Sequence, residues 1–409
     1  MRTRYGVPYW LNRYPKARQP SYPRHRGALD VQVAILGGGL TGCSTAYVFA
    51  AAGVRVALVE GHRVGQGGSA SCPGLLRLEP AVAFEALKTQ HGLRVARHLW
   101  QSFRRAGLDM AATIRRLRVR CELVPDAALR IGLNNGDERM LRREMAAMRA
   151  AAVEGSWLTP ARLRQETGLA GIGAIRSAGD AFIDPYRAAL GLAAEAVKRR
   201  AQVFERTPVT RIRSGRKGVE LMTDSGVIRA ETIVVASHHP LPAFKPLRRH
   251  FDSREAFCVL TPPVPSFVRR EFGRSRAIVI DHENPPHILR RTSDERVMFL
   301  GTDGAPVPAR AREKAMVQRT GQLMYELSKL YPAIAGTRPE YGWFVPVSVA
   351  PDGFVCIGPH RNYPRHLFAF GSGHNGVASA YLAARVLLRQ YLAAPDKGDE
   401  LFGFARLLG

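Results

Sequence analysis

Residues 31–60 read VQVAILGGGLTGCSTAYVFAAAGVRVALVE, and this stretch decides the fold. It contains, in order, an apolar strand, a glycine-rich turn, a helix of small residues and a second strand, at 31–36, 37–42, 43–52 and 54–59. This order predicts a βαβ unit whose turn binds a dinucleotide. The alternative is an ordinary βαβ unit that happens to have a glycine-rich turn.

Three glycines and one acid give this unit its chemistry. Gly37 permits the tight turn, Gly39 lets the backbone approach a pyrophosphate, and Gly42 lets the helix pack closely on the strand. The pyrophosphate then lies at the helix N-terminus, where free N–H groups and the helix dipole favour negative charge. Glu60 ends the second strand, where a carboxylate accepts hydrogen bonds from ribose hydroxyls. An acid here argues against the 2′-phosphate of NADP and leaves NAD and FAD open.

Length and composition set the class of protein. A chain of 409 residues favours two domains, and 46% hydrophobic residues suffice for a full core. We find no run of 18 apolar residues, which predicts no membrane span, and no apolar signal segment at the N-terminus. The five cysteines are scattered without a C-x-x-C pair. This usage fits a reducing cytoplasm and predicts no metal site.

The formal charge of +26 has two interpretations. A large positive charge suggests an anionic partner such as nucleic acid. However, only 8 of the 60 basic residues are lysine, and the arginines are spread along the chain. This distribution favours the second interpretation, in which the charge reflects a generally arginine-rich surface and no specific partner. The exception is segment 1–27, where basic residues alternate with aromatics and acids are absent. Such an arm either contacts nucleic acid, the less favoured interpretation, or lies across its own domain.

The pattern of elements predicts an α/β protein with two interleaved domains. The βαβ unit near the start and a strand, glycine loop and helix within 340–392 indicate one Rossmann-like cofactor domain built from distant segments. A second, α+β substrate domain with an antiparallel sheet takes the middle of the chain. We expect the arm at 1–27, the cofactor domain at 28–112, 176–245 and 340–409, and the substrate domain at 113–175 and 246–339. Expected helices include 139–152, 186–199 and 311–330, and a buried strand is expected at 233–236.

Several short motifs, taken together, resemble one known family. They are the loop GGSAS (67–71), the segments APDGFVCIGP (350–359) and GSGHNGVASA (371–380), the arm motif PYWL (8–11), LRRTSDERVMFLGTD (289–303) and ELFGFAR (400–406). In this order they resemble the D-amino-acid-oxidase-type FAD-dependent oxidoreductases, which include glycine oxidase, sarcosine oxidase and the γ-glutamylputrescine oxidase type. The resemblance runs nearly end to end. It implies that FAD is bound in an extended form, and that a C–H bond next to an amine is oxidised to an imine by hydride transfer to the flavin.

The resemblance also implies which residues bind FAD. They are Gly37, Gly39, Leu40, Thr41, Gly42, Glu60, Gly68, Ser69, Gly74, Val209, Gly373, His374, Asn375, Gly376 and Val377. The GSGHNG loop precedes a helix, so its amides are expected to face the flavin edge that gains negative charge on reduction. Where some relatives attach the flavin through Cys or His, this chain has Val345, so we expect non-covalent FAD. Where the family often has glycine after strand 233–236, this chain has Ser237-His238-His239.

Three residues are predicted to act on the substrate. A substrate carboxylate needs a cation, preferably the fork of an arginine. Arg290 matches the family's R-x-T strand position, and Arg77 follows the loop near the flavin, although either alternatively serves in a surface ion pair. His374, in the flavin loop, is expected to polarise the ring or the substrate. Cys72 is expected to pack near the flavin rather than act as a nucleophile.

The predicted substrate is a small amine or amino acid, and the electron acceptor is oxygen or an unknown partner. Two alternatives remain at this point. The same scaffold acts on modified tRNA uridines in one branch of the superfamily, which would suit the positive charge. A scaffold that binds FAD but has lost activity is the other.

Overall fold

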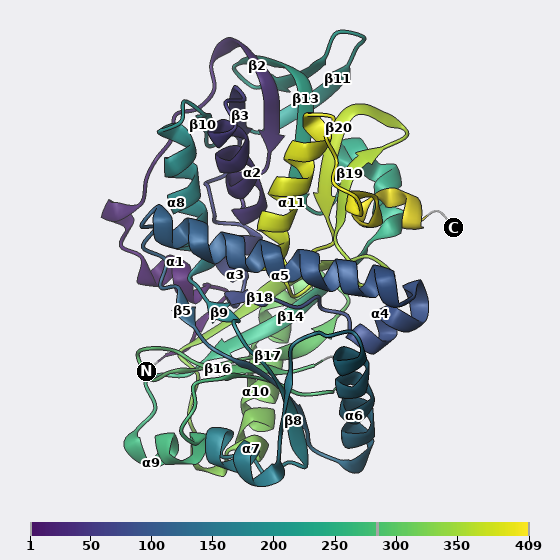
Figure 1. The fold of residues 1–409 in the computed structure, drawn as a ribbon. Coiled ribbons are helices and arrows are strands. Elements are labelled where there is room, and N and C mark those ends of the chain that lie inside the picture. Colours follow the sequence, from purple (N-terminus) through teal and green to yellow (C-terminus); the bar gives the residue numbers. More distant parts are fainter. Residues whose placement is uncertain (1, 284–285, 408–409) are drawn as a thin grey trace.

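The computed structural model describes residues 2–283 and 286–407, which form two large sheets joined by helices (Figure 1). The first sheet has the strand order β10 (Gln202–Phe204), β3 (Val56–Val59), β2 (Gly27–Leu36), β13 (Gly226–His238), β12 (Val219–Thr223) and β11 (Val209–Ser214). β20 (Tyr363–Phe370) pairs with the second half of β13, and β19 (Cys356–His360) pairs with β20. The β10, β3, β2, β13 and β20 pairings are all parallel.

Three helices cover one face of this sheet: α2 (Leu40–Ala51), α8 (Pro185–Val197) and α11 (Gly376–Tyr391). The long helix α5 (Leu93–Arg116) packs across α11. α2 packs against α8 and α11 through small residues such as Ala46 and Ala380, both fully buried. The opposite face is closed by the 3-10 segment Pro242–His250 and by Phe404 near the C-terminus. Both faces of the parallel strands are therefore apolar, as a buried parallel sheet requires.

The second sheet is larger and mostly antiparallel. Its order is β1 (Arg4–Tyr5), β18 (Tyr341–Val349), β14 (Asp252–Leu260), β17 (Val297–Gly304), β16 (Ile288–Arg291), β15 (Ile278–Ile280), β6 (Ala128–Gly132), β8 (Gly173–Ser177) and β7 (Ser156–Leu158). Within this sheet, among the described strands, only the β1–β18 and β15–β6 pairs are parallel. Helix α10 (Arg312–Leu330) packs against β14, β17 and β18. The antiparallel sheet expected for the middle of the chain is therefore present, and strands from both ends of the chain join it.

Shorter elements complete the chain. A small sheet joins β4 (Leu75–Leu76), β9 (Ala181–Phe182) and β5 (Val124–Pro125). The remaining α-helices are α1 (Tyr9–Arg13), α3 (Gly68–Ser71), α4 (Phe84–His91), α6 (Asn135–Ala150), α7 (Pro160–Thr167) and α9 (Ser266–Arg269). No helix of the described residues is long and apolar enough to cross a bilayer.

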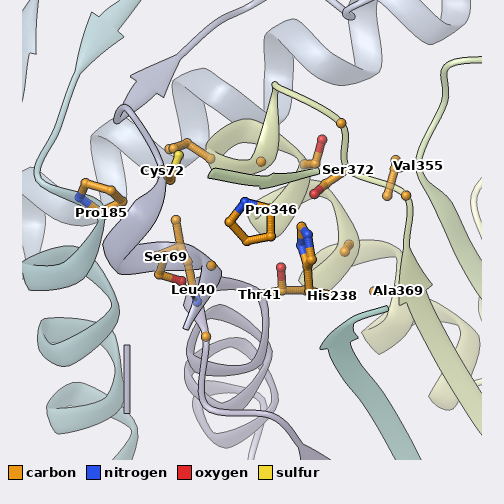
Figure 2. Close-up of a pocket in the computed structure, with 18 of the residues that line it drawn as sticks. Leu40, Thr41, Ser69, Cys72, Pro185, His238, Pro346, Val355, Ala369 and Ser372 are labelled. Atoms are coloured by element: carbon orange, nitrogen blue, oxygen red, sulfur yellow. Dashed lines mark hydrogen bonds between the residues drawn. The ribbon is translucent and has the colours of Figure 1, made fainter. Parts of the chain in front are cut away.

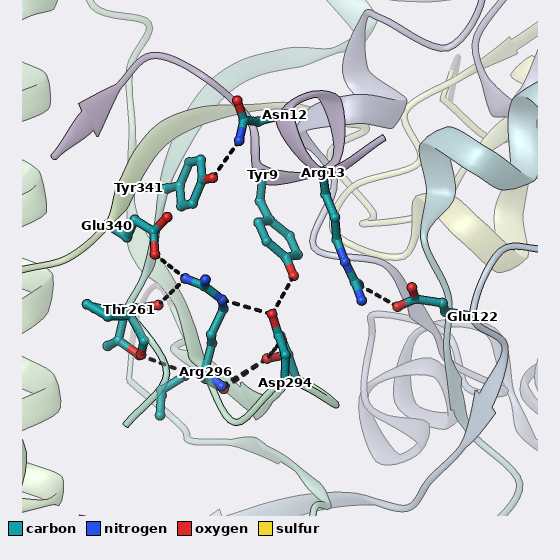
Figure 3. Close-up of polar contacts among 12 residues, drawn as sticks. Tyr9, Asn12, Arg13, Glu122, Thr261, Asp294, Arg296, Glu340 and Tyr341 are labelled. Carbon is teal, nitrogen blue, oxygen red and sulfur yellow. Dashed lines mark hydrogen bonds and ion pairs between the residues drawn. The ribbon is translucent and has the colours of Figure 1, made fainter. Parts of the chain in front are cut away.

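The N-terminal arm lies against its own domains. β1 pairs with β18, and Trp10 of α1 is fully buried. Figure 3 shows the polar contacts of α1: the Tyr9 hydroxyl donates to Asp294 (3.1 Å), Asn12 donates to the Tyr341 hydroxyl (2.8 Å), and Arg13 pairs with Glu122 (2.5 Å). Aromatic and basic groups of the arm are thus used inside the protein, as the second interpretation of segment 1–27 expects.

Strands of the two large sheets alternate along the chain. Segments 27–59, 202–238 and 356–370 hold the strands of the first sheet, and the strands of the larger sheet come before the first of these segments and between them. β18 belongs to the larger sheet, although its residues fall inside the segment 340–409 expected for the cofactor domain. Residues 341–349 thus carry the chain from the larger sheet to the parallel one.

Candidate cofactor site

A cavity of about 870 Å³, its open mouth included, lies at the carboxyl ends of β13 and β20. Open α/β sheets bind ligands at this edge. Its walls come from the start of α2, from α3, from the end of β13, from β18, and from the loop before α11 (Figure 2). The lining includes Gly39, Leu40, Thr41, Gly68, Ser69, Cys72, His238, Val345, Pro346, Gly373, His374, Gly376 and Val377. Segments far apart in the sequence therefore meet at one site.

The glycine turn has the geometry that a dinucleotide requires. Gly37 has φ +103, and a Cβ there would lie 2.6 Å from the carbonyl oxygen of Ala236. A Cβ on Gly42 would overlap the carbonyl oxygen of Gly37, so only glycine allows this approach of helix and strand. Gly39 has an extended backbone and starts α2, and its nearest neighbour on the Cβ side is Ser69 Oγ at 3.3 Å. The backbone at the helix N-terminus is thus open to a pyrophosphate.

Glu60 stands at the end of β3, where the sequence places it. Its Oε2 accepts from the Gly38 N–H at 2.6 Å, and its Oε1 accepts from the His62 N–H at 2.8 Å. Oε2 thus contacts the glycine turn, and a carboxylate at this place suits a ribose bound beside the turn. The segment leading to Val209 runs alongside, because the Thr207 N–H donates to the Glu60 carbonyl at 3.0 Å. Val209 itself is half-buried at the start of β11 and is not among the residues that line the cavity.

The GGSAS loop forms the opposite wall. Ser69 Oγ accepts a hydrogen bond from the Leu40 N–H at 2.7 Å and so caps α2. Gly68 faces the ring of His238, whose Nδ1 would lie 3.7 Å from a Cβ at this position. Gly74 has φ +84 and pairs with Ile183, so it shapes the loop but does not line the cavity. Of the three loop residues predicted to contact the cofactor, Gly68 and Ser69 line the cavity and Gly74 does not.

The loop before α11 carries His374 into the lining. The Gly373 N–H donates to the Ser348 carbonyl at 2.9 Å, which ties the loop to β18. The Asn375 side chain donates to the carbonyl oxygen of Glu79 at 2.6 Å, so Asn375 supports the loop from outside the cavity. His374 Nε2 lies 3.2 Å from Asp303 Oδ2. These contacts hold the amides at the start of α11 toward the cavity.

His238 is a cavity residue that the sequence reasoning left out. It is the last residue of β13 and has φ +68, a conformation that glycine adopts freely and histidine rarely does. Burial lowers the pKa of His238 to about 4, so the imidazole is neutral at pH 7. Its Nε2 is buried without a hydrogen-bond partner in the described part of the chain. Its position at the carboxyl end of a buried parallel strand was the signal available in the sequence.

Neither predicted arginine lines this cavity. Arg77 pairs with Glu79 at 3.2 Å, within a buried cluster that also holds Arg130 and Glu144, 2.8 Å apart. Burial raises the pKa of Asp180, beside this cluster, to about 7. Arg77 therefore occupies an internal ion-pair network.

Arg290 lies in a second, smaller cavity with Trp10, Arg13, Asp126 and Phe182. Its guanidinium stacks on the Phe182 ring, and Nη1 is buried without a partner among the described residues. Burial lowers the pKa of Arg290 well below its usual value. Trp10 separates the two cavities, because it lines the second one and bonds to Cys72, which lines the first.

The rest of the cavity lining that the structure describes is mostly apolar and offers no reactive nucleophile. Burial raises the pKa of the Cys72 thiol to about 11, so the thiol stays protonated and packs as a small apolar group. Val345 and Pro346 present hydrocarbon from β18. Together with the glycine turn, the carboxylate of Glu60 and the start of α2, this lining fits an extended dinucleotide with an aromatic ring at its far end.

Comparisons with known proteins agree with this geometry. The model of the family described as FAD dependent oxidoreductase (DAO) matches residues 32–390. Glycine oxidase of Bacillus licheniformis is 25% identical over 380 residues, which cover 90% of this chain and 95% of that protein. Gamma-glutamylputrescine oxidoreductase of Escherichia coli is 24% identical over 77% of this chain and 73% of its own length. The crystal structure of glycine oxidase from Geobacillus kaustophilus has the same fold, with a TM-score of 0.76 at 22% identity, covering 93% of this chain and 100% of that one.

Proposed function

Because the chain belongs to the family of FAD dependent oxidoreductases, we propose that it oxidises the C–H bond next to an amine nitrogen in a small amine or amino acid. The product is an imine, which water hydrolyses. FAD, when bound, supplies the acceptor for the hydride. The relatives named for glycine oxidation and gamma-glutamylputrescine oxidation support this class of substrate.

The observation that carries the proposal is one continuous cavity from the glycine turn to the loop of His374. The start of α2 lines one end and suits the pyrophosphate of FAD, and Glu60, which lies beside the glycine turn but outside the lining, suits the ribose. The far end is lined by Val345, Pro346 and the loop before α11. We place the flavin ring at this far end. The backbone amides at the start of α11 would then face the ring, where they and the helix dipole would favour negative charge.

The chain's own groups bind and orient the reactants. Pro346 and the apolar residues beside it exclude water from the ring, and the loop of Gly373–Val377 presents backbone amides to it. FAD is bound non-covalently, because Val345 stands where some relatives attach the flavin and a valine side chain cannot form that bond. Oxygen or another acceptor then takes the electrons.

The test is the visible absorption spectrum of the purified protein, recorded before and after anaerobic addition of a pool of amines and amino acids. We expect flavin bands that bleach with the pool, and splitting the pool then identifies the substrate. A protein that does not take up FAD would overturn the cofactor assignment. A protein that holds FAD but is reduced by no amine would overturn the substrate class.

We propose a small-molecule substrate rather than a nucleic acid. Tyr9, Trp10 and Arg13 of the arm are engaged with the protein itself, which leaves less of segment 1–27 for an RNA contact. The five cysteines are free thiols, four of them buried, and we place the protein in a reducing compartment such as the cytoplasm.

A further inference from the structure

The wall of the cofactor cavity carries no lysine, arginine, aspartate or glutamate among the described residues. Most of the wall is hydrocarbon and backbone, and its polar side chains are hydroxyls, the Cys72 thiol and the imidazoles of His238 and His374. The chain as a whole has 60 lysines and arginines, so their absence from this wall sets the site apart from the rest of the protein. The composition of the wall therefore bears on the charge that a substrate can carry.

The two imidazoles supply no free positive charge to the cavity. Burial lowers the pKa of His238 to about 4, so this ring is neutral at pH 7. His374 Nε2 lies 3.2 Å from Asp303 Oδ2, and the Asp303 side chain is only 6% exposed. A positive charge on the His374 ring would therefore already be balanced by its own carboxylate partner. An anionic substrate group finds no unpaired cation in either ring.

Arginines outside the wall are engaged elsewhere. Arg254 lies 2.8 Å from Asp252 and 3.6 Å from Asp303, so two carboxylates share its charge. Arg77 and Arg290, the two arginines predicted to hold a substrate carboxylate, lie in an internal ion-pair cluster and in the second cavity. The fold thus places both predicted carboxylate anchors away from the cavity in which the substrate must meet the flavin.

A carboxylate on the oxidised carbon has to enter this cavity. In an α-amino acid it is bonded directly to the carbon that gives up its hydride, and this carbon must lie against the flavin ring. The carboxylate then lies at the same far end, beside Val345 and Pro346. The amides at the starts of α2 and α11 are already assigned to the pyrophosphate and the ring. Taking an anion out of water without a cation is costly, whereas an uncharged group has no such cost.

We propose that the substrate is an amine without a carboxylate on the carbon that is oxidised, so that simple amines are preferred to α-amino acids. The inference rests on the proposed function and narrows its substrate class. The group that stands in place of the carboxylate is uncharged, because hydrocarbon from Val345 and Pro346 faces it.

The test compares amino acids with uncharged counterparts in the anaerobic reduction of the holoenzyme flavin. Glycine, alanine and leucine are each paired with their amino alcohol, in which a hydroxymethyl group replaces the carboxylate at nearly the same size. Each is also paired with the amine that lacks the group altogether. We expect each amino acid to reduce the flavin at least about 100-fold more slowly than its amino alcohol. Because the amino alcohol controls for size, the difference reports the charge.

The amine pool that tests the proposed function supplies the other outcomes. When the pool identifies a different amine, the comparison is made with that amine and its α-carboxylated counterpart. An α-amino acid that reduces the flavin as fast as its uncharged counterpart would overturn the inference, while the proposed function stands. If no amine or amino acid reduces the flavin of the holoenzyme, both fall.

A binding measurement does not depend on turnover. Isovalerate and isovaleramide have the same shape, but only isovalerate is charged at pH 7, and the spectrum of the oxidised flavin reports their binding. We expect the amide to bind at least about 10-fold more tightly than the carboxylate. Val345→Arg places a cation in the wall and should reverse this order, whereas Val345→Met, the matched control without charge, should keep it. Tighter binding of isovalerate to the unchanged holoenzyme would contradict the inference.

Discussion

The indole N–H of Trp10 donates a hydrogen bond to the backbone carbonyl of Cys72, 2.8 Å away. The indole of Trp343 in β18 makes a similar contact with the carbonyl of Ser71, at 2.9 Å. Two buried indoles, one from the arm and one from the larger sheet, thus fix the backbone that follows Ser69. The wall of the cofactor cavity depends on both.

Replacing Trp10 with alanine tests this support. We expect the free energy of unfolding to fall by about 3–5 kcal/mol, because a fully buried indole is removed. FAD affinity should fall with it, since the loop of Ser69 loses a fixed point. Urea unfolding and equilibrium FAD titration measure the two effects. The control is Tyr5→Ala in the same arm, where the side chain is 42% exposed and a change within about 0.5 kcal/mol is expected.

A single methyl group at Gly42 should abolish FAD binding. A Cβ there would overlap the Gly37 carbonyl oxygen, so α2 has to move away from β2. Gly321→Ala in α10 is the matched control, because no atom lies within 4 Å of its added Cβ. That change should raise stability by about 0.5–1 kcal/mol and leave FAD binding intact. Retained FAD affinity in Gly42→Ala would show that the turn has another role.

His238 should make stability depend on pH. Its pKa is about 4 in the folded protein and about 6.5 when unfolded, so the unfolded chain binds the proton first as pH falls. The folded state loses about 2 kcal/mol between pH 6.5 and pH 5 through this group. His238→Asn removes the group and tolerates the positive φ. Urea unfolding of the cofactor-free protein at pH 7 and pH 5 should show a smaller loss in the variant, and equal losses would contradict the assignment.

Arg290→Met should stabilise the protein without ligand. The guanidinium is buried with an unpartnered Nη1 among the described residues, and burying an uncompensated charge costs several kcal/mol. An apolar side chain of similar length should raise the free energy of unfolding by about 1–4 kcal/mol. If Arg290 binds a substrate carboxylate, as the family resemblance implies, the variant should also weaken reduction by amino acids but not by simple amines. A destabilised variant would mean that Arg290 already has an effective partner.

The sequence predicted the parts of the site that depend on local chemistry. The turn at 37–42, the acid at the end of β3 and the glycine loop before α11 all lie where their motifs placed them, because backbone contact with a dinucleotide requires these residue types in this order. Two of the three expected helices, α8 and α10, begin and end within two residues of their expected bounds, whereas α6 begins four residues before the expected 139.

Long-range placement was beyond the sequence. Nothing local to Asp303 indicates that it contacts His374, some 70 residues later in the chain. Arg290 and Arg77 carry the charge that a carboxylate needs, but the fold places them in a second cavity and in an ion-pair cluster. His238 was not predicted, although it ends a buried parallel strand, because a histidine at that place belongs to no motif.

The pairing of β1 with β18 also sets an order of assembly. Arg4 lies opposite Tyr341, so the first strand waits for a partner made more than 300 residues later. During synthesis the arm emerges first, but β1 has a strand to pair with only after residue 341 has been made and a loop of more than 300 residues has closed. A chain interrupted before residue 341 therefore lacks the strand with which β1 pairs.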